Sequence, residues 1–338
     1  MRTSAAWILS LVALTSFATR PAAARIGFVT HVGQMSLIRG NRIAAPFPVG
    51  DSPSMMAFSP SGARLYVTDL RSDNGYQGDL VVLNPATSQI LATVPLGGLP
   101  GQAAVHPDGS RVYVPIYDVL TGANARVMII DTTTLATTAV PVPFGASGAA
   151  IDPASGRLYV TSVGGSGPVF GSVAGAFTVI DTTTDTVAAS APLPGGPRAI
   201  VLHRDGSRAY AATLTATIMI IDTATLSLTG SIPAGAFGGL AIESGGRNLY
   251  AANPNGALSI IDTTTETIRA QVPLGPSYGL AVDPKTGKLW VGEESSLAVV
   301  NVGCRPRVVH RRSIGRTPVG IAFEPCPSCA VRPSRPCP

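Results

Sequence analysis

An aromatic string of seven residues occurs six times along the chain at a nearly constant interval. Its copies are RLYVTDL from Arg64, RVYVPIY from Arg111, RLYVTSV from Arg157, RAYAATL from Arg208, NLYAANP from Asn248 and KLWVGEE from Lys288. Their aromatic residues, at positions 66, 113, 159, 210, 250 and 290, are 47, 46, 51, 40 and 40 residues apart. Because a period of about 40 to 50 residues is that of a four-stranded propeller blade, the repeat predicts an all-β propeller in place of two ordinary domains.

Each period contains four short apolar segments, named here strands A to D, separated by turns rich in Gly, Pro, Asn and Asp. Strand A is small and apolar, as in GLAI from Gly239, which suits a strand crowded around a narrow axis. Strand B carries the aromatic residue. Strand C ends in an Asp-Thr turn, and the repeated acids are Asp131, Asp181, Asp222 and Asp262. Since an Asp at such a turn accepts backbone N–H bonds two residues on, we interpret these acids as turn builders and assign them no catalysis.

The strand count indicates how the ring closes. Strand A begins at seven places, which are Met55, Gln102, Gly148, Ala199, Gly239, Gly279 and Gly320. Strand B also occurs seven times once GFVTH from Gly27 is included. The N-terminal repeat lacks strand A, whereas the last segment, GIAFEP from Gly320, is a single strand A. We therefore predict a seven-bladed β-propeller of four-stranded antiparallel blades over residues 25–325, closed by the C-terminal strand pairing into the N-terminal blade.

The repeated strings resemble the YVTN family of β-propeller repeats, within the WD40-like and lactonase-like propeller superfamily. The likeness lies in LYVT at Leu65 and Leu158 and in the Ile-Asp-Thr turns, and it covers nearly all of the chain after residue 24. The copies at Arg208 and Lys288 depart from the pattern, with AYAAT and LWVGE. The resemblance implies the propeller fold and an extracytoplasmic location, and it implies little about activity.

The first 24 residues have the pattern of a secretory signal peptide. Arg2 supplies positive charge, residues 5–17 form a short apolar run, and Ala22-Ala23-Ala24 offers a small-residue cleavage site. The run is shorter than the roughly 20 apolar residues that a membrane-spanning helix needs. We therefore expect a periplasmic or secreted protein that begins near Arg25, with an uncleaved anchor or a buried first helix as the alternative.

The formal net charge of +5 is concentrated near the C-terminus. Residues 25–302 hold 15 Lys and Arg against 18 Asp and Glu, whereas residues 303–338 hold seven Arg against Glu324 alone. No aromatic side chains alternate with these arginines to stack on bases. We therefore expect no nucleic-acid partner.

All four cysteines, Cys304, Cys326, Cys329 and Cys337, also lie in the C-terminal part. In an exported protein they favour disulfides over a four-cysteine zinc site. Cys304 follows strand C and Cys326 follows the closing strand A, so both belong to one face of adjacent blades. We predict a disulfide from Cys304 to Cys326 or Cys329, and an irregular tail rich in Cys, Pro and Arg over residues 326–338.

Two sets of variable positions fall on the face that carries the B-to-C and D-to-A connections, which we name the loop face. The fourth residue of each YVTN-like string gives the ring His31, Asp69, Ile116, Ser162, Thr213, Asn253 and Glu293. The residue before each strand A gives a second ring, Ser54, Gly101, Ser147, Arg198, Gly238, Tyr278 and Val319. Three adjacent blades also have long B-to-C loops, residues 69–79, 117–125 and 162–175. Insertions gathered on one face often mark a binding surface, although tolerated loop drift explains them equally well.

These observations select candidate binding residues on the loop face and at the mouth of the channel. They are His31, Asp69, Asp73, Tyr76, Asp79, Tyr117, Asp118, Arg198, Asn253, Tyr278, Glu293 and Glu294. The loop from Asp73 to Asp79 contains several oxygen ligands, which suit calcium, but it lacks the spacing of an EF-hand. We therefore interpret it as a solvated loop, with a calcium site as the weaker alternative, and expect no cofactor. His31 and the Glu293-Glu294 pair become neighbours through ring closure. We interpret them as plain surface positions, with an acid/base or metal pair as the alternative.

No haem-attachment, nucleophile-elbow, phosphate-loop or zinc-protease motif occurs in the sequence, and we assign no catalytic residue or metal ligand. We expect a non-enzymatic extracytoplasmic binding or interaction module, monomeric, whose loop face holds a protein, a glycan or a small ligand. The alternative is a lactonase-like hydrolase at the channel mouth, for which the candidate side chains are His31, Asp69, Arg198 and Glu293. A redox propeller with haem or a quinone is a third interpretation. Fold alone does not decide among these functions.

Overall fold

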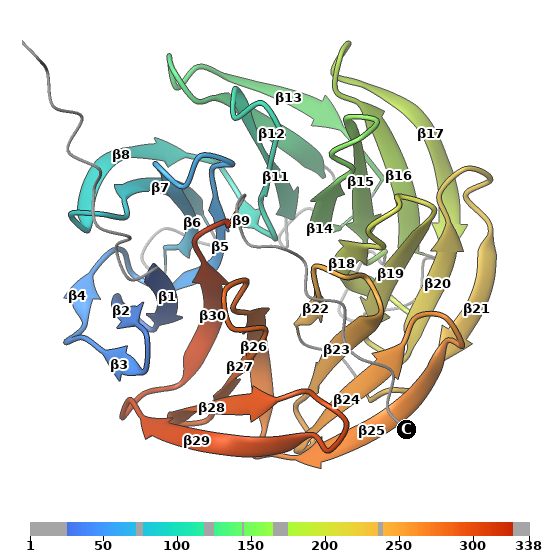
Figure 1. Cartoon of the computed structure of the whole chain (residues 1–338). Coiled ribbons are helices and arrows are strands. Elements are labelled where there is room, and N and C mark those ends of the chain that lie inside the picture. Colours follow the sequence, from blue (N-terminus) through green and yellow to red (C-terminus); the bar gives the residue numbers. More distant parts are fainter. Residues whose placement is uncertain are drawn as a thin grey trace, which may run out of the picture.

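The protein folds into seven antiparallel sheets arranged in a ring, as the computed structural model in Figure 1 shows. The structure describes residues 26–71, 77–117, 125–143, 145–164, 175–235 and 239–326. These residues form strands and no helix, so none of them belongs to a helix long and apolar enough to cross a membrane. The prediction of an all-β, seven-bladed propeller is confirmed.

Blades 1 to 3 contain the strands β1 to β13 together with the last strand, β30. Blade 1 consists of β30 (Pro318–Phe323), β1 (Ile26–His31), β2 (Gln34–Arg39) and β3 (Arg42–Ile43), with β4 (Phe47–Pro48) also paired to β2. Blade 2 consists of β5 (Pro53–Phe58), β6 (Leu65–Leu70), β7 (Gly78–Asn84) and β8 (Gln89–Pro95). Blade 3 consists of β9 (Leu99–Pro100) and β10 (Ala104–Val105), which both pair with β11 (Arg111–Tyr117), and then β12 (Arg126–Asp131) and β13 (Thr137–Pro141).

Blades 4 to 7 repeat the four-stranded pattern. Blade 4 consists of β14 (Ala146–Ile151), β15 (Arg157–Ser162), β16 (Gly175–Asp181) and β17 (Thr186–Leu193). Blade 5 consists of β18 (Pro197–Leu202), β19 (Arg208–Thr213), β20 (Ile218–Asp222) and β21 (Leu228–Ile232). Blade 6 consists of β22 (Leu240–Ile242), β23 (Asn248–Asn253), β24 (Ala257–Asp262) and β25 (Thr267–Pro273). Blade 7 consists of β26 (Ser277–Val282), β27 (Leu289–Glu293), β28 (Ser296–Asn301) and β29 (Arg307–Ser313).

Ring closure joins the two ends of the propeller within blade 1. β30 pairs antiparallel with β1, from Gly27 opposite Phe323 to Val29 opposite Ile321. The predicted closure by the C-terminal strand is therefore confirmed. Closure matters physically because an open propeller would expose an apolar blade face and unpaired strands to other chains.

The apolar core lies between the blades and not within one centre. The described residues form seven clusters of buried side chains, one between each pair of neighbouring blades. The repeated aromatic residue of strand B fills the gap to the next blade, as Tyr66 does against blade 3 and Trp290 does against blade 1. Each of these rings is at most 2% exposed. The aromatic repeat is thus explained by packing between blades.

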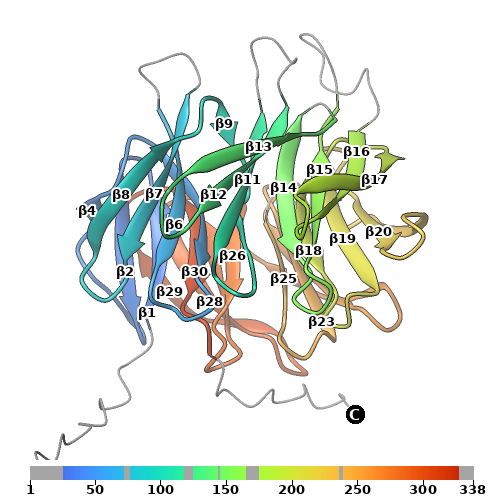
Figure 2. The same ribbon diagram turned by 90° about the horizontal axis from the view of Figure 1, so that it is seen from above.

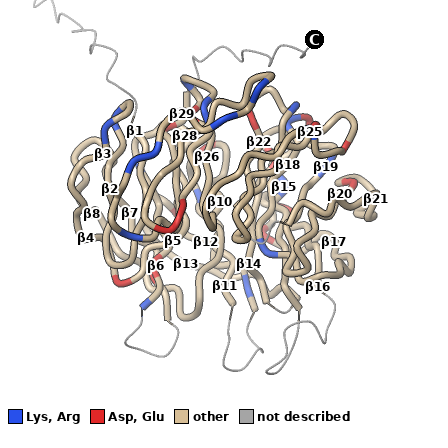
Figure 3. Tube along the Cα trace, turned by 90° about the horizontal axis from the view of Figure 1, so that it is seen from below, with Lys and Arg blue, Asp and Glu red and all other residues tan. Residues whose placement is uncertain are grey.

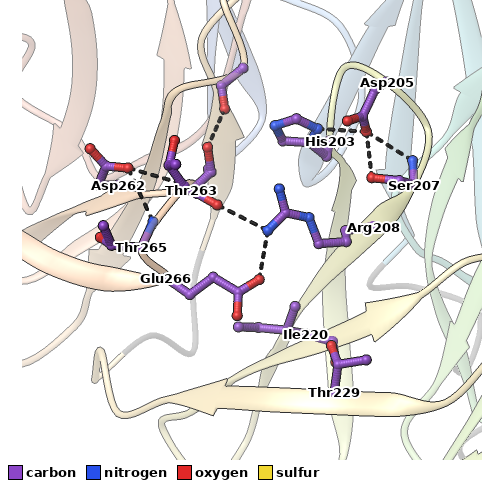
Figure 4. A network of polar contacts seen from close by, with 12 residues as sticks. His203, Asp205, Ser207, Arg208, Ile220, Thr229, Asp262, Thr263, Thr265 and Glu266 are labelled. Atoms are coloured by element: carbon purple, nitrogen blue, oxygen red, sulfur yellow. Dashed lines mark hydrogen bonds and ion pairs between the residues drawn. The ribbon is translucent and has the colours of Figure 1, made fainter. Parts of the chain in front are cut away.

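The arginine that opens several strand-B strings connects its blade to the C-to-D turn of the next one. Figure 4 shows Arg208, whose guanidinium donates to the Thr263 carbonyl at 2.9 Å and to the Glu266 carboxylate at 2.7 Å. Arg111 of blade 3 forms the equivalent ion pair with Asp185 of blade 4 at 2.7 Å. The first residue of the string is therefore also a structural element.

The threonine and aspartate of the repeat have structural roles as well. The Thr161 hydroxyl in blade 4 donates to the Arg198 carbonyl at 2.8 Å in blade 5, and it accepts from the Gly148 amide at 3.2 Å in its own blade. Asp131 accepts the backbone amides of Thr133 and Thr134 at 2.9 and 2.7 Å. These backbone hydrogen bonds lower the pKa of Asp131. The interpretation of the repeated acids as turn builders is confirmed at this turn.

Candidate functional site

The channel of the propeller opens on the loop face, uppermost in Figure 2, as a cavity of about 750 Å³. All seven blades contribute to its described lining. The lining residues are Ser54, Met55, Leu70, Leu99, Pro100, Gly101, Gln102, Tyr117, Ala146, Ser147, Val163, Arg198, Ala199, Leu214, Gly239, Tyr278 and Val319. The cavity is therefore a property of the whole ring.

The middle of the cavity is formed by the residues that precede or begin strand A. Six of the seven positions of the second predicted ring line it, among them Arg198 and Tyr278, and the seventh, Gly238, lies outside the described residues. Gln102 of blade 3 lies one residue deeper. Its side-chain amide donates to the Ile200 carbonyl of blade 5 at 3.3 Å. This hydrogen bond connects blade 3 with blade 5 and places a polar side chain on the channel wall.

Apart from Tyr117, the upper wall of the cavity comes from residues that the sequence analysis did not select. Leu70, Tyr117, Val163 and Leu214 each follow the fourth position of a YVTN-like string, in blades 2 to 5. Leu99 and Pro100 of β9 add further apolar surface. Of these residues only Tyr117 was a candidate. The signal available in the sequence was the apolar character of four residues at positions where a strand meets a loop.

The fourth-position residues themselves do not line the cavity. Asp69 is only 3% exposed, and its carboxylate accepts the backbone amides of Asp51 and Ser52 at 3.1 and 2.9 Å. Burial raises the pKa of Asp69, and the two amide hydrogen bonds oppose that effect. Because successive side chains of a strand point to opposite sides, the fourth residue faces its own D-to-A connection while the fifth faces the channel.

Glu293 has the same role in blade 7. Its carboxylate accepts from the Gly275 amide at 3.0 Å and the Ser296 hydroxyl at 2.8 Å, and it pairs with Arg311 at 3.1 Å. Burial raises the pKa of Glu293, but the hydrogen bonds from Gly275, Arg311 and Ser296 outweigh it, and the net shift is downward. Glu294, the next residue, is exposed.

His31 lies at the end of β1 and is 1% exposed. Its Nε2 lies 3.0 Å from the Ser36 hydroxyl, and its Nδ1 has no hydrogen-bond partner among the described residues. Burial, with a smaller effect of the Arg316 charge, lowers the pKa of His31. The interpretation of His31 and Glu293 as plain surface positions is wrong, because both side chains are buried. They also form no hydrogen bond with each other, since each bonds to its own blade.

The remaining candidates divide between described and undescribed segments. Asn253 accepts the Asn255 amide at 2.8 Å and shapes a turn. Asp79 is buried and forms an ion pair with Arg71 at 2.6 Å. Asp73, Tyr76 and Asp118 lie outside the described residues, as does most of the loop considered for calcium. Within the described ranges, no group of three or more His, Cys, Asp or Glu residues is placed to hold a metal ion.

Two His-Asp pairs lie on the face opposite the loop face. His106 Nδ1 contacts Asp108 at 2.6 Å, and His203 Nδ1 contacts Asp205 at 2.6 Å, as Figure 4 shows for the second pair. His106 Nε2 also lies 3.3 Å from the Thr182 hydroxyl, which is the arrangement of an activated nucleophile. Thr182, however, is only 4% exposed and donates to the Gly156 carbonyl at 2.5 Å. This contact between blades therefore has a structural role.

The basic C-terminal part of the propeller lies along the outer edge of blade 7, and Figure 3 shows the basic residues of β29. Arg307 and Arg311 are exposed on this strand. Neither Cys304, before β29, nor Cys326, after β30, is a free thiol. Cys329 and Cys337 lie outside the described residues, so the pairing of the cysteines stays a prediction.

The fold and the cavity define the chain as a seven-bladed β-propeller with a pocket at one end of its channel. No family model and no curated protein matches it, so the YVTN resemblance rests on the repeated strings alone.

Solved structures share the fold. A functionally unknown protein from Desulfotomaculum acetoxidans DSM 771 has a TM-score of 0.68 at 17% identity, over 88% of this chain and 98% of that one. Kuenenia stuttgartiensis hydrazine synthase has a TM-score of 0.59 at 21% identity, over 78% and 80% of the two chains. The dihydro-heme d1 dehydrogenase NirN, in complex with DHE, has a TM-score of 0.58 at 16% identity, over 89% and 66%. At these identities the likeness shows the fold alone.

Proposed function

We propose that the protein is an extracytoplasmic binding module that takes a small ligand into the loop-face end of its channel. The observation that supports this function is the cavity of about 750 Å³, lined by all seven blades. Sites for small molecules are typically concave, roughly 300 to 1,000 Å³ in volume and mostly apolar, with a few polar groups that fix orientation. The polar side chains of the described lining are those of Arg198, Gln102, two serines and two tyrosines.

A binding role fits the lining better than the lactonase-like alternative. A hydrolase needs a nucleophile, a general acid or base, or a metal that converge on the substrate. Asp69, Glu293 and His31 were the acidic and imidazole candidates, and each is buried and bonded within the protein. Among the described residues that line the cavity there is no Asp, Glu or His. Arg198 is the one candidate of that set on the cavity surface.

The extracytoplasmic part of the proposal rests on the N-terminal segment. The charged start, the short apolar run and the Ala22-Ala23-Ala24 site together have the pattern of an export signal. Fusion of residues 1–30 to a reporter enzyme that is active only after export tests it. Reporter activity supports export, and an inactive reporter that is retained in the cytoplasm contradicts it.

The cavity itself is tested by filling it. Val319 of β30 lines the cavity, whereas Val187 of β17 is 41% exposed on the outer edge of blade 4. We expect compounds from a metabolite library to raise the melting temperature of the wild-type protein, since a ligand selective for the folded state stabilises it by mass action. Val319→Trp should abolish these shifts and Val187→Trp should keep them. Shifts that survive in Val319→Trp, or a library without any shift, would overturn the proposal.

A further inference from the structure

We infer that the ligand of the cavity is an amphipathic organic anion, with its negative group on Arg198 and its apolar body against the wall of blades 2 to 5. This inference rests on the proposed function, because it concerns the same cavity. It names the chemical class of the ligand from the charge and the shape of the described lining.

Arg198 is the one charged residue among the described lining residues. Its main chain is fixed, because the Arg198 carbonyl accepts the Thr161 hydroxyl at 2.8 Å. Its side chain is exposed and forms no hydrogen bond or ion pair with another described residue. Arg111 and Arg208, in contrast, both bind acids of a neighbouring blade. The Arg198 guanidinium is therefore available to a ligand.

Among the described residues, no Asp or Glu forms an ion pair or a hydrogen bond with the Arg198 side chain. Asp69 and Glu293, two described acids of the loop face, accept hydrogen bonds from backbone amides, and Glu293 also pairs with Arg311. A guanidinium presents paired N–H donors whose spacing matches the two oxygens of a carboxylate or a sulfonate. Apolar surroundings strengthen such a contact, because they screen charge less than water does.

Most of the large apolar side chains among the described lining residues come from blades 2 to 5. Leu70, Leu99, Tyr117, Val163 and Leu214 belong to blades 2 to 5 and form the upper wall. Tyr278 of blade 7 supplies a large side chain that is 45% exposed. A small inorganic anion would leave this wall in contact with water, and an organic cation would be repelled by Arg198. A carboxylate or sulfonate with an apolar chain or ring satisfies both parts of the site.

A matched pair of probes tests the inference. Decanoate and decanol share one apolar chain, and they differ in the anionic group. We expect isothermal titration to show that decanoate binds at least about tenfold more tightly than decanol, since hydrogen bonds to charged groups are the stronger ones. The decanoate affinity should also fall with added salt, because salt screens a charge contact near the surface.

The matched variants are Arg198→Ala and Arg204→Ala, which remove the same charge from blade 5. Arg204 is exposed in the A-to-B turn, on the face opposite the cavity. Arg198→Ala should weaken decanoate about tenfold and leave decanol unchanged, and Arg204→Ala should leave both probes unchanged. Equal affinity for the two probes, or equal effects of the two variants, would contradict the inference that the ligand is an anion bound by Arg198.

The outcomes separate this inference from the proposed function. If decanol binds as well as decanoate and Val319→Trp blocks both, the cavity is a binding site and the inference about charge is wrong. If library compounds bind in the cavity but decanoate does not, the inference is wrong and the binding function stands. If no compound binds, both are wrong.

Discussion

The inner strands of neighbouring blades approach so closely that an alanine in place of Gly148 is expected to destabilise the whole ring. A Cβ added at Gly148 of β14 would lie 2.1 Å from the Arg198 carbonyl oxygen and 2.6 Å from the Thr161 hydroxyl. Gly148 does not have a positive φ, so the conflict is one of space. A similar close approach occurs at Gly101, where an added Cβ would lie 1.9 Å from the carbonyl oxygen of Ser147.

The magnitude follows from the cost of overpacking. Forcing an extra methyl group into a well-packed region costs about 1–3 kcal/mol, and the closed ring cannot widen at one interface without moving the others. For a propeller of about 300 residues, an unfolding entropy of about 2.1 cal/mol/K per residue converts 2 kcal/mol into a fall in melting temperature of about 3 °C. Calorimetry measures the melting temperature. Urea unfolding, monitored by the fluorescence of the buried Trp290, measures the free energy of unfolding.

Gly230→Ala is the control for this prediction. Gly230 lies in β21 at the outer edge of blade 5, and a Cβ there would be 3.4 Å from its nearest neighbour, the Ile220 Cδ1 atom. This variant should change the free energy of unfolding by less than about 0.5 kcal/mol, as surface substitutions usually do. If Gly148→Ala and Gly230→Ala unfold at the same urea concentration, close strand packing at the axis is not what makes glycine necessary.

Three further predictions concern the contacts that hold the ring together. A double-mutant cycle of Arg208→Ala and Glu266→Ala should give a coupling energy of about 0.5 kcal/mol. The value is small because both side chains are roughly 30% exposed, so water partly screens their charges. A coupling energy of zero would contradict a stabilising ion pair between the blades. Burial lowers the pKa of His31, so the stability that neutral His31 contributes is present above about pH 6.5 and is lost as the pH falls below it. Urea titrations from pH 7.5 to 5 should therefore show a smaller loss for His31→Gln than for the wild-type protein, and parallel losses would refute the assignment. A disulfide from Cys304 to Cys326 would close a loop of 23 residues and contribute about 3 kcal/mol, so reduction should lower the melting temperature by about 5 °C, whereas an unchanged value would refute that bond.

The fold was predictable because each blade repeats its own construction signals. The spaced aromatic residues, such as Tyr66 and Trp290, mark a strand that must be covered by the next blade. The missing strand A at one end and the extra strand A from Gly320 at the other predicted the pairing of β30 with β1. Both signals are local in sequence, and the ring follows from repeating one contact seven times.

The site was only partly predictable, because a repeat gives a period but not the direction in which each side chain points. The ring before strand A, including Arg198 and Tyr278, was placed on the cavity from topology alone. Asp69 and Glu293 were selected from the same topology, yet their carboxylates satisfy backbone amides of the D-to-A connections. A buried backbone amide needs a hydrogen-bond acceptor. Asp69 and Glu293, each at the end of strand B, supply that acceptor. Polarity at the end of a strand therefore did not distinguish a ligand contact from a loop contact.

Arg198 shows how a departure from the repeat separates function from construction. Equivalent positions in blades 2, 3 and 4 hold Ser54, Gly101 and Ser147, so the ring does not need a long cationic side chain at this point. The main-chain hydrogen bond to Thr161 is independent of the side chain. Arg198→Ser should therefore leave the free energy of unfolding within about 0.5 kcal/mol of the wild-type value, as expected for a surface residue without a structural partner. Sites that serve ligands are often neutral or unfavourable for stability, so an unchanged urea midpoint together with lost decanoate binding would locate the role of Arg198 in the ligand. A loss of more than about 1 kcal/mol in the ligand-free protein would instead make Arg198 a structural residue, and the cavity would then lack its anion contact.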